Sequence, residues 1–176
     1  MARATGGTIT TSGDYTIHTF ISDGVFTPDP TLDEVEVLVV AGGGGGGRGR
    51  NTSFGVGGSG GGGGGGVVHE EDFEVTPGAS ISVVVGDGGR GGNTSQGADG
   101  VDGENSEFGD LVAIGGGASA LASNANSPDP YQSGNDGGSG GGASRRSVIV
   151  EVNNGGAGLQ PGSASGGFGN AGGSIP

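Results

Sequence analysis

Two uninterrupted runs of glycine constrain this chain more than any other feature. The first covers residues 42–47 and directly follows the apolar stretch DEVEVLVVA, and the second covers residues 60–66 and directly precedes VVHEEDFEV. Glycine makes up 49 of the 176 residues, about 28%, against an average near 7%. Ordering a glycine costs more backbone entropy than ordering any other residue, so a fold that orders these runs has to offset that cost. They are a phosphate-binding loop, a flexible linker or part of a rigid structure in which glycine segments pack against one another.

The phosphate-loop interpretation fails on the residues that follow the first run. Gly42, Gly44 and Gly47 match G-x-G-x-x-G after a strand, but a run of glycines matches any glycine spacing. Such a motif binds phosphate only when a helix follows and its amino end faces the phosphates. The sequence RGRNTSFGVGG does not favour a helix, since glycine costs ~1 kcal/mol per helical position relative to alanine. No G-K-[ST] follows either.

Packing of the glycine segments into a rigid structure explains the runs better than the linker interpretation does. Flexible linkers separate modules that fold alone, whereas these runs lie among strand segments too poor in apolar residues to fold independently. Polyglycine II helices have three residues per turn, and their outward N–H and C=O groups can bond to neighbouring helices because no Cβ intervenes. We therefore expect two structural glycine rods, each spanning roughly 19–22 Å. Their residues are Gly42, Gly43, Gly44, Gly45, Gly46, Gly47, Gly60, Gly61, Gly62, Gly63, Gly64, Gly65 and Gly66.

The remaining sequence predicts an all-β fold, with a small antiparallel β base or sandwich carrying the packed polyglycine II helices. Strand patterns occupy residues 14–28, 33–41, 67–75, 79–86, 110–114 and 146–152, and no credible helix is present. Tyr15, Ile17, Thr19 and Ile21 alternate onto one strand face. The apolar end of 33–41 is typical of a strand buried on both sides. We divide the chain into N-terminal strands that contact the assembly (1–32), a glycine-rich β/polyglycine II domain (33–152) and a glycine-rich tail (153–176).

Charge and composition argue against several classes of function. The formal net charge of −13 disfavours nucleic acid and anionic membrane surfaces as partners. The chain has no cysteine, and it contains no apolar run long enough for membrane insertion. It shows no export signal, so we expect synthesis in the cytoplasm. His18 and His69 lack ligand spacing, and no catalytic set can be assembled. Asp99, Asp102 and Glu104 lack the spacing of a calcium loop and indicate a solvated turn, with a weak cation site as the alternative. We expect no catalytic, metal or cofactor site.

Three stretches are informative together: SDGVFTPDPTLDEVEVLVVAGGGGGG, GGGGGGGVVHEEDFEVTPGASISVVVGDGGRGG and NSEFGDLVAIGGGASA. They resemble the glycine-rich domain of bacteriophage tail fibres and related virion proteins. The order of strand, glycine run, V-T-P-G hairpin and N-S-x-F-G segment carries the resemblance, over roughly residues 15–120. The chain is also similar to the distal adhesins of T-even phages, in which polyglycine II helices form a sandwich and loops at its end touch the receptor. The resemblance implies a virion surface location, other virion proteins as partners and a host cell-surface receptor.

Two segments are the best candidates for receptor contact. The first is the proline-stiffened loop of residues 123–136, with Pro130, Tyr131 and Gln132, because tyrosine favours contact surfaces. The second lies between the glycine runs and offers Arg48, Arg50 and Phe54. We expect a homo-oligomer, with a trimer favoured, because a single chain supplies few long rods. A capsid decoration or head fibre protein and a bacterial extracellular filament subunit remain as alternatives, and an enzyme with a phosphate loop is the least favoured class.

Overall fold

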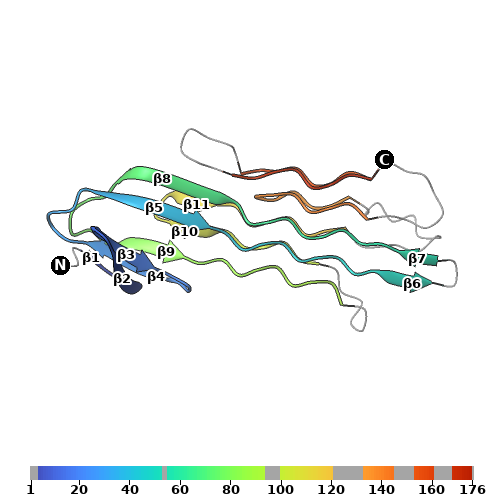
Figure 1. The fold of residues 1–176 in the computed structure, drawn as a ribbon, viewed down its shortest axis with the longest axis horizontal. Helices are drawn as coiled ribbons and strands as arrows, with labels where there is room; N and C mark the ends of the chain where they lie inside the picture. The colour runs from blue at the N-terminus through green and yellow to red at the C-terminus, as the bar shows by residue number, and fades with distance from the viewer. Residues whose placement is uncertain are drawn as a thin grey trace.

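The computed structural model describes residues 4–52, 55–93, 100–120, 133–144, 153–160 and 168–175. In this part of the chain there are strands but no helix. The strands are β1 (Ala4–Thr5), β2 (Thr8–Ser12), β3 (Tyr15–Thr19), β4 (Gly24–Pro28), β5 (Glu34–Val40), β6 (Arg50–Thr52), β7 (Gly55–Gly57), β8 (Val67–Glu74), β9 (Ile81–Val84), β10 (Ser106–Phe108) and β11 (Leu111–Ala113). Figure 1 shows most strands gathered at one end, the base, with long irregular traces running to the other end.

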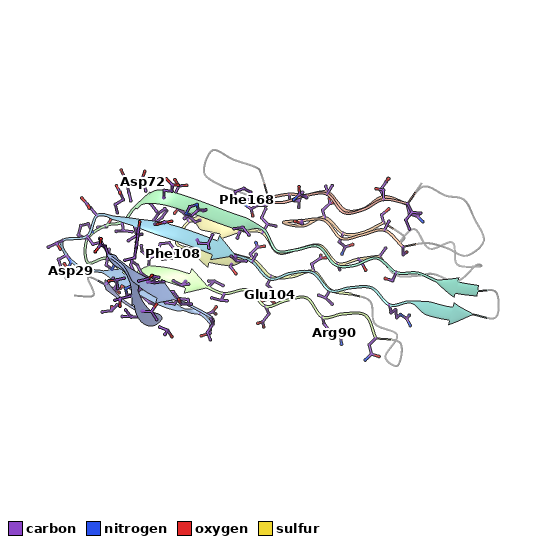
Figure 2. The ribbon with its side chains drawn as sticks, viewed as in Figure 1. Asp29, Asp72, Arg90, Glu104, Phe108 and Phe168 are labelled. Carbon is purple, nitrogen blue, oxygen red and sulfur yellow. The ribbon has the colours of Figure 1, made fainter. Side chains whose placement is uncertain are left out.

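The base consists of two antiparallel layers that enclose a small core. One layer is a five-stranded sheet of order β1-β4-β9-β10-β11, and the other is the ribbon β5–β8. Three phenylalanines join the layers: the ring centroids of Phe26 and Phe108 lie 5.6 Å apart, as do those of Phe73 and Phe108. Figure 2 shows Phe108 inside the base, with Asp29 and Asp72 on its outside. The all-β fold with a small antiparallel base is therefore confirmed.

The strand predictions agree with the structure except at β5. Strands occupy the expected segments at 14–28, 33–41, 67–75, 79–86 and 110–114, although β3 ends before Ile21, and the segment 146–152 lies outside the described residues. The prediction that β5 is buried on both faces is wrong. Val37 and Val39 are 7% exposed, whereas Leu38 and Val40 are 65% and 55% exposed. The reason is that the β5–β8 ribbon is an outer layer, so that only one of its faces meets the core.

The described residues between and after the base strands form nine extended segments, which we call rods 1–9. In chain order they comprise residues 41–47, 60–66, 86–92, 100–105, 114–120, 133–137, 138–144, 153–160 and 168–175. Figure 1 shows them as nearly parallel traces leading away from the base. Both predicted glycine runs are rods. Seven further segments join them, so the expectation that one chain supplies few rods is wrong.

Hydrogen bonds between the rods recur at every third residue. The N–H groups of Ala41, Gly44 and Gly47 in rod 1 donate to the carbonyls of Gly66, Gly63 and Gly60 in rod 2, at 3.0, 2.8 and 3.3 Å. The same spacing connects rod 3 to rod 1, with Gly89 and Gly92 donating to Gly43 and Gly46. A repeat of three residues is that of the polyglycine II helix. The pairings also set direction: odd-numbered rods run away from the base and even-numbered rods run back.

The rods need glycine for space and not for an unusual backbone conformation. Among the described glycines, positive φ angles occur only at Gly6, Gly7, Gly13, Gly78 and Gly109, none of which lies in a rod. In rod 2 a Cβ at Gly62 or Gly65 would collide with the carbonyl oxygen of Gly44 or Ala41, whereas a Cβ at Gly61 or Gly64 would meet nothing within 4 Å. One position in three therefore faces open space, and the other two face neighbouring backbone.

Truncation of the central core ring tests the base. Phe108→Ala should lower the free energy of unfolding by about 3–5 kcal/mol, because it removes the ring between the two layers and leaves a cavity. Leu38→Ala is the control, since Leu38 is 65% exposed and should change stability by no more than ~0.5 kcal/mol. Chemical denaturation measures both values, and a similar loss for the two variants would contradict this account of the core.

Alanine substitution at neighbouring glycines tests the rod packing. Gly62→Ala should destabilise the protein by about 1–3 kcal/mol, because the methyl group must displace the backbone of rod 1. Gly61→Ala, one position away in the same rod, should be neutral or stabilise by about 0.4–1 kcal/mol, because alanine restricts the unfolded chain. Calorimetry measures the stability of both variants and so tests whether the rods are packed. Indistinguishable effects at the two positions are expected only if the run is a flexible linker.

Candidate functional site at the distal end of the rods

Rod 5 lies at the centre of the bundle and fixes the positions of the rods around it. Residues 115–120, with the sequence GGGASA, are all buried. Backbone hydrogen bonds connect this rod to rods 1, 2, 4, 6 and 7. For example, Gly116 N–H donates to Gly42 at 2.9 Å and Gly117 N–H donates to Ser139 at 2.9 Å. A chain enclosed in this way leaves its neighbours little freedom to shift.

Side-chain oxygens accept the N–H groups of rod 5 that no backbone carbonyl reaches. Asp102 Oδ1 accepts from Ala118 at 2.6 Å, and Asn105 Oδ1 accepts from Gly115 at 2.9 Å. At the base end of the rod, Oε1 of the buried Gln160 accepts from Ile114 at 2.7 Å. Every N–H from residue 114 to residue 120 therefore has an acceptor. This complete pairing of the N–H groups stabilises rod 5, because an unpaired buried N–H costs about 1–3 kcal/mol.

Rod 4 shows how sequence encodes a rod without a glycine run. In GVDGEN, residues 100–105, each third residue has the same role. A Cβ at Gly100 or Gly103 would press on the backbone of rod 1. Asp102 and Asn105 accept N–H groups of rod 5, and Val101 and Glu104 are exposed. Asp102 and Glu104 are exposed, as predicted, but they lie in an extended rod and not in a turn, and Asp99 lies outside the described residues.

Four pairs of consecutive rods have their free ends opposite the base, at what we call the distal end. The chain leaves the bundle there after rods 1, 3, 5 and 7, and it re-enters in rods 2, 4, 6 and 8. Side chains tie the rods together near these exits. Ser59 Oγ donates to the Ala120 carbonyl at 3.0 Å, and Gly47 N–H donates to Ser119 Oγ. Asn153 Nδ2 donates to the Ser144 carbonyl at 2.9 Å, which joins rods 7 and 8.

The predicted receptor-contact residues fall at or beside this distal end where the structure describes them. Arg48 directly follows rod 1, and its Nε is buried without a hydrogen-bond partner among the described residues. Arg50 begins β6 and pairs with Gly57 of β7. Figure 1 shows β6 and β7 at the distal extremity. The other predicted residues, Phe54, Pro130, Tyr131 and Gln132, lie outside the described residues. The structure thus brings Arg48 and Arg50 to one end and leaves the remaining predictions open.

Both histidines make structural contacts. His18 Nδ1 lies 2.8 Å from the Gly6 carbonyl oxygen, and His69 Nε2 lies 2.9 Å from Glu36 Oε1 across the β5–β8 ribbon. Figure 2 shows Arg90 and Glu104 on the outside of the bundle. Within the described ranges, no three His, Asp or Glu side chains gather as a metal site requires. The same residues contain no helix with the length and apolar character needed to cross a membrane.

Sequence reasoning missed most of the rods that hold the distal end in place. It recognised uninterrupted glycine runs but not rods 3–9, in which glycine shares the chain with Ala, Ser, Asn and Asp. The usable signal was the spacing of three between residues that must be small, as at Gly100 and Gly103. The strand β2 was also missed, although TITTS is rich in β-branched residues.

Hydrogen exchange tests whether this bundle is a rigid support. The amides of Gly116, Gly117 and Ser119 should exchange only through global unfolding, because each donates to a neighbouring rod inside the bundle. Measurement by NMR gives their protection factors directly, with Phe108 in the base as the internal reference. Exchange within seconds at these three amides, alongside slow exchange at Phe108, would mean that the rods move independently of the base.

Comparison with known proteins identifies the family but gives no close relative. No curated protein and no solved structure matches the chain. The family model described as a glycine-rich domain matches residues 19–175, which include the base from the end of β3 onward and all nine rods. The chain therefore belongs to the glycine-rich domain family.

Proposed function

We propose that this chain is a structural virion surface protein of a bacteriophage, a fibre or fibre tip that presents its distal end to the host cell surface. One observation carries the proposal: four pairs of consecutive rods have their free ends together at one end, and the hydrophobic core lies at the other. Connecting segments on a rigid scaffold are where recognition residues concentrate. The rods add length between the two ends without requiring a longer hydrophobic core.

The chemistry of the rods suits a role outside the cell. Their stability depends on backbone hydrogen bonds, and disulfides play no part in it, since the chain has no cysteine. The order of sequence segments resembles the glycine-rich domains of tail fibres, which supports the virion assignment. In this proposal the receptor contacts come from Arg48, Arg50 and Phe54 and from Pro130, Tyr131 and Gln132, other virion proteins bind the base, and no catalysis occurs.

Two alternatives have the same architecture but a different place of assembly. A capsid decoration or head fibre protein would use the base to bind the shell. A bacterial extracellular filament subunit would add strands between copies, and the outer strands β1 and β11 of the five-stranded sheet offer edges for that purpose. Negative-stain electron microscopy of the purified chain distinguishes these classes. We expect discrete particles of uniform length, whereas indefinite filaments would reject the virion proposal.

Binding to cells tests the recognition role. The full chain, labelled with a fluorophore, should bind saturably to some members of a panel of bacterial strains. Tyr131→Ala and Arg48→Ala should each weaken binding about tenfold or more, which is roughly 1.4 kcal/mol, without lowering the unfolding temperature. Asp72→Ala, on the outside of the base, is the control and should bind as the parent does. Absence of saturable binding, or equal loss with Asp72→Ala, would reject recognition through the distal end.

A further inference from the structure

The N-terminal hairpin β2–β3, which we call the arm, belongs neither to the two core layers nor to the rods. β1 pairs with β4 in the five-stranded sheet, and the chain then continues through Gly6 and Gly7 into β2, which pairs with β3 alone. All ten residues of the two strands are exposed except His18, which is half-buried. Figure 1 shows the arm on the outside of the base, away from the distal end. A two-stranded hairpin is only marginally stable by itself in water.

The arm is nevertheless held in one orientation relative to the base. Gly6 and Gly7 have φ angles of 113° and 61°, which side-chain-bearing residues rarely adopt. A Cβ at these positions would collide with the carbonyl oxygens of Val25 and Thr19. The His18 ring meets Phe26 edge-on, with the ring centroids 5.2 Å apart. Because the bend is fixed, a partner that binds the arm would not have to order it first.

Both long edges of the arm are unpaired in the part of the chain that the structure describes. Proteins usually protect such edges with lysine, other charges, proline or bulges. The strands TITTS and YTIHT contain none of these charges or prolines, and their register shows no bulge. The outer face carries the cross-strand pairs Thr8–Thr19, Thr10–Ile17 and Ser12–Tyr15. Tyr15 is 68% exposed and Ile17 is 43% exposed. Hydroxyl pairs and aromatic or β-branched pairs of this kind stabilise sheets.

The charge distribution indicates what covers the arm. The chain has 19 acidic residues and a net charge of −13, yet residues 4–22 contain a single acidic residue, Asp14, and no Lys or Arg. Two copies of so acidic a chain repel each other wherever their carboxylates meet. They can approach through the arm with little such repulsion.

The other exposed apolar face does not have this property. It lies on the outside of the β5–β8 ribbon, where Leu38 and Val40 are 65% and 55% exposed and Phe168 of rod 9 is 62% exposed. The same two strands carry six carboxylates, those of Glu34, Glu36, Glu70, Glu71, Asp72 and Glu74. A contact between two copies at this face would bring both sets of carboxylates together.

We propose that the arm is the contact between copies of this chain, with the edge of β2 or β3 of one copy pairing with the arm of a second copy. Main-chain hydrogen bonds across the new edge and the Thr, Ile and Tyr side chains beside it would supply the affinity. Pairing through the same strand in both copies gives a closed dimer, whereas pairing of β2 with β3 gives a ring if the rotation closes and a filament if it does not.

The mass of the full chain in solution tests the proposal. Sedimentation and light scattering should show a multimer at micromolar concentration. Ile17→Glu, which places a carboxylate on the outer face of the arm, should shift the mass to that of a monomer. A second variant replaces residues 8–19 by Ser-Gly, which the pairing of Thr8 with Thr19 allows, and should give the same result. Leu38→Glu is the matched control on the ribbon and should remain multimeric.

Each alternative outcome contradicts the proposal. A monomeric parent chain, arm variants that stay multimeric, or dissociation by Leu38→Glu alone would each overturn it. Calorimetric unfolding of every variant ensures that a monomer is a folded one.

Spin labels locate the contact independently of mass. Because the chain has no cysteine, Thr10→Cys gives one label per copy. Two arms of five-residue strands, about 17 Å long, should place these labels within roughly 30 Å of each other. Longer distances in an intact multimer would show that another surface joins the copies.

This inference deepens the proposed assembly but does not stand or fall with the proposed recognition. A multimer that depends on the arm, in a protein that binds no cell, would support the arm contact and reject the recognition role. A closed trimer would satisfy both proposals, and an arm-dependent open filament would favour the filament alternative.

Discussion

The hydrogen bond between the backbones of neighbouring rods is the interaction on which the rest of this molecule depends. Ordering one residue costs about 1–2 kcal/mol of backbone entropy, and one hydrogen bond contributes about 0.5–1.5 kcal/mol net. A rod bonded on one side only is therefore not stable. Rod 5 is bonded to five neighbours, and its donors are all paired. The rods therefore stabilise one another together or not at all, and the bundle is a cooperative unit.

The base has a conventional side-chain core, unlike the bundle, and it determines the register of the rods. Its core is small and contains a few valines, alanines and phenylalanines. The base sets the register of the rods, because β5 runs directly into rod 1, rod 2 runs into β8, and β9 and β11 run into rods 3 and 5. Once strand pairing fixes where each rod begins, the three-residue repeat fixes which groups meet along its length. A conventional side-chain core thus specifies an arrangement that a glycine lattice could not specify alone, since all registers of a glycine run look alike.

The difference between the side-chain core of the base and the backbone packing of the rods has a functional consequence. Side chains are excluded from most positions inside the bundle, so substitutions should be tolerated mainly at exposed rod positions. The base and the bundle are both constrained by packing. The arm is an exposed feature at the end opposite the distal end, and its uncharged strands contrast with the acidic base around it. A molecule with distinct surfaces at its two ends is suited to joining an assembly at one end and contacting a surface at the other.

The sequence by itself determined the class of structure. Valine-rich alternation predicted the strands of the base, and unbroken glycine predicted rods at residues 42–47 and 60–66, because only a residue without Cβ lets backbones approach so closely. It did not reveal rods such as 100–105 and 114–120, in which Asp102, Asn105 and Ala118 replace glycine. Whether a position tolerates a Cβ depends on what lies across from it, as the contrast between Gly61 and Gly62 makes clear. Local sequence cannot contain that information, because the opposing carbonyl comes from another rod. Only the tertiary structure decided which residues pack inside the bundle, which are exposed, and that four pairs of rod ends lie together at one end.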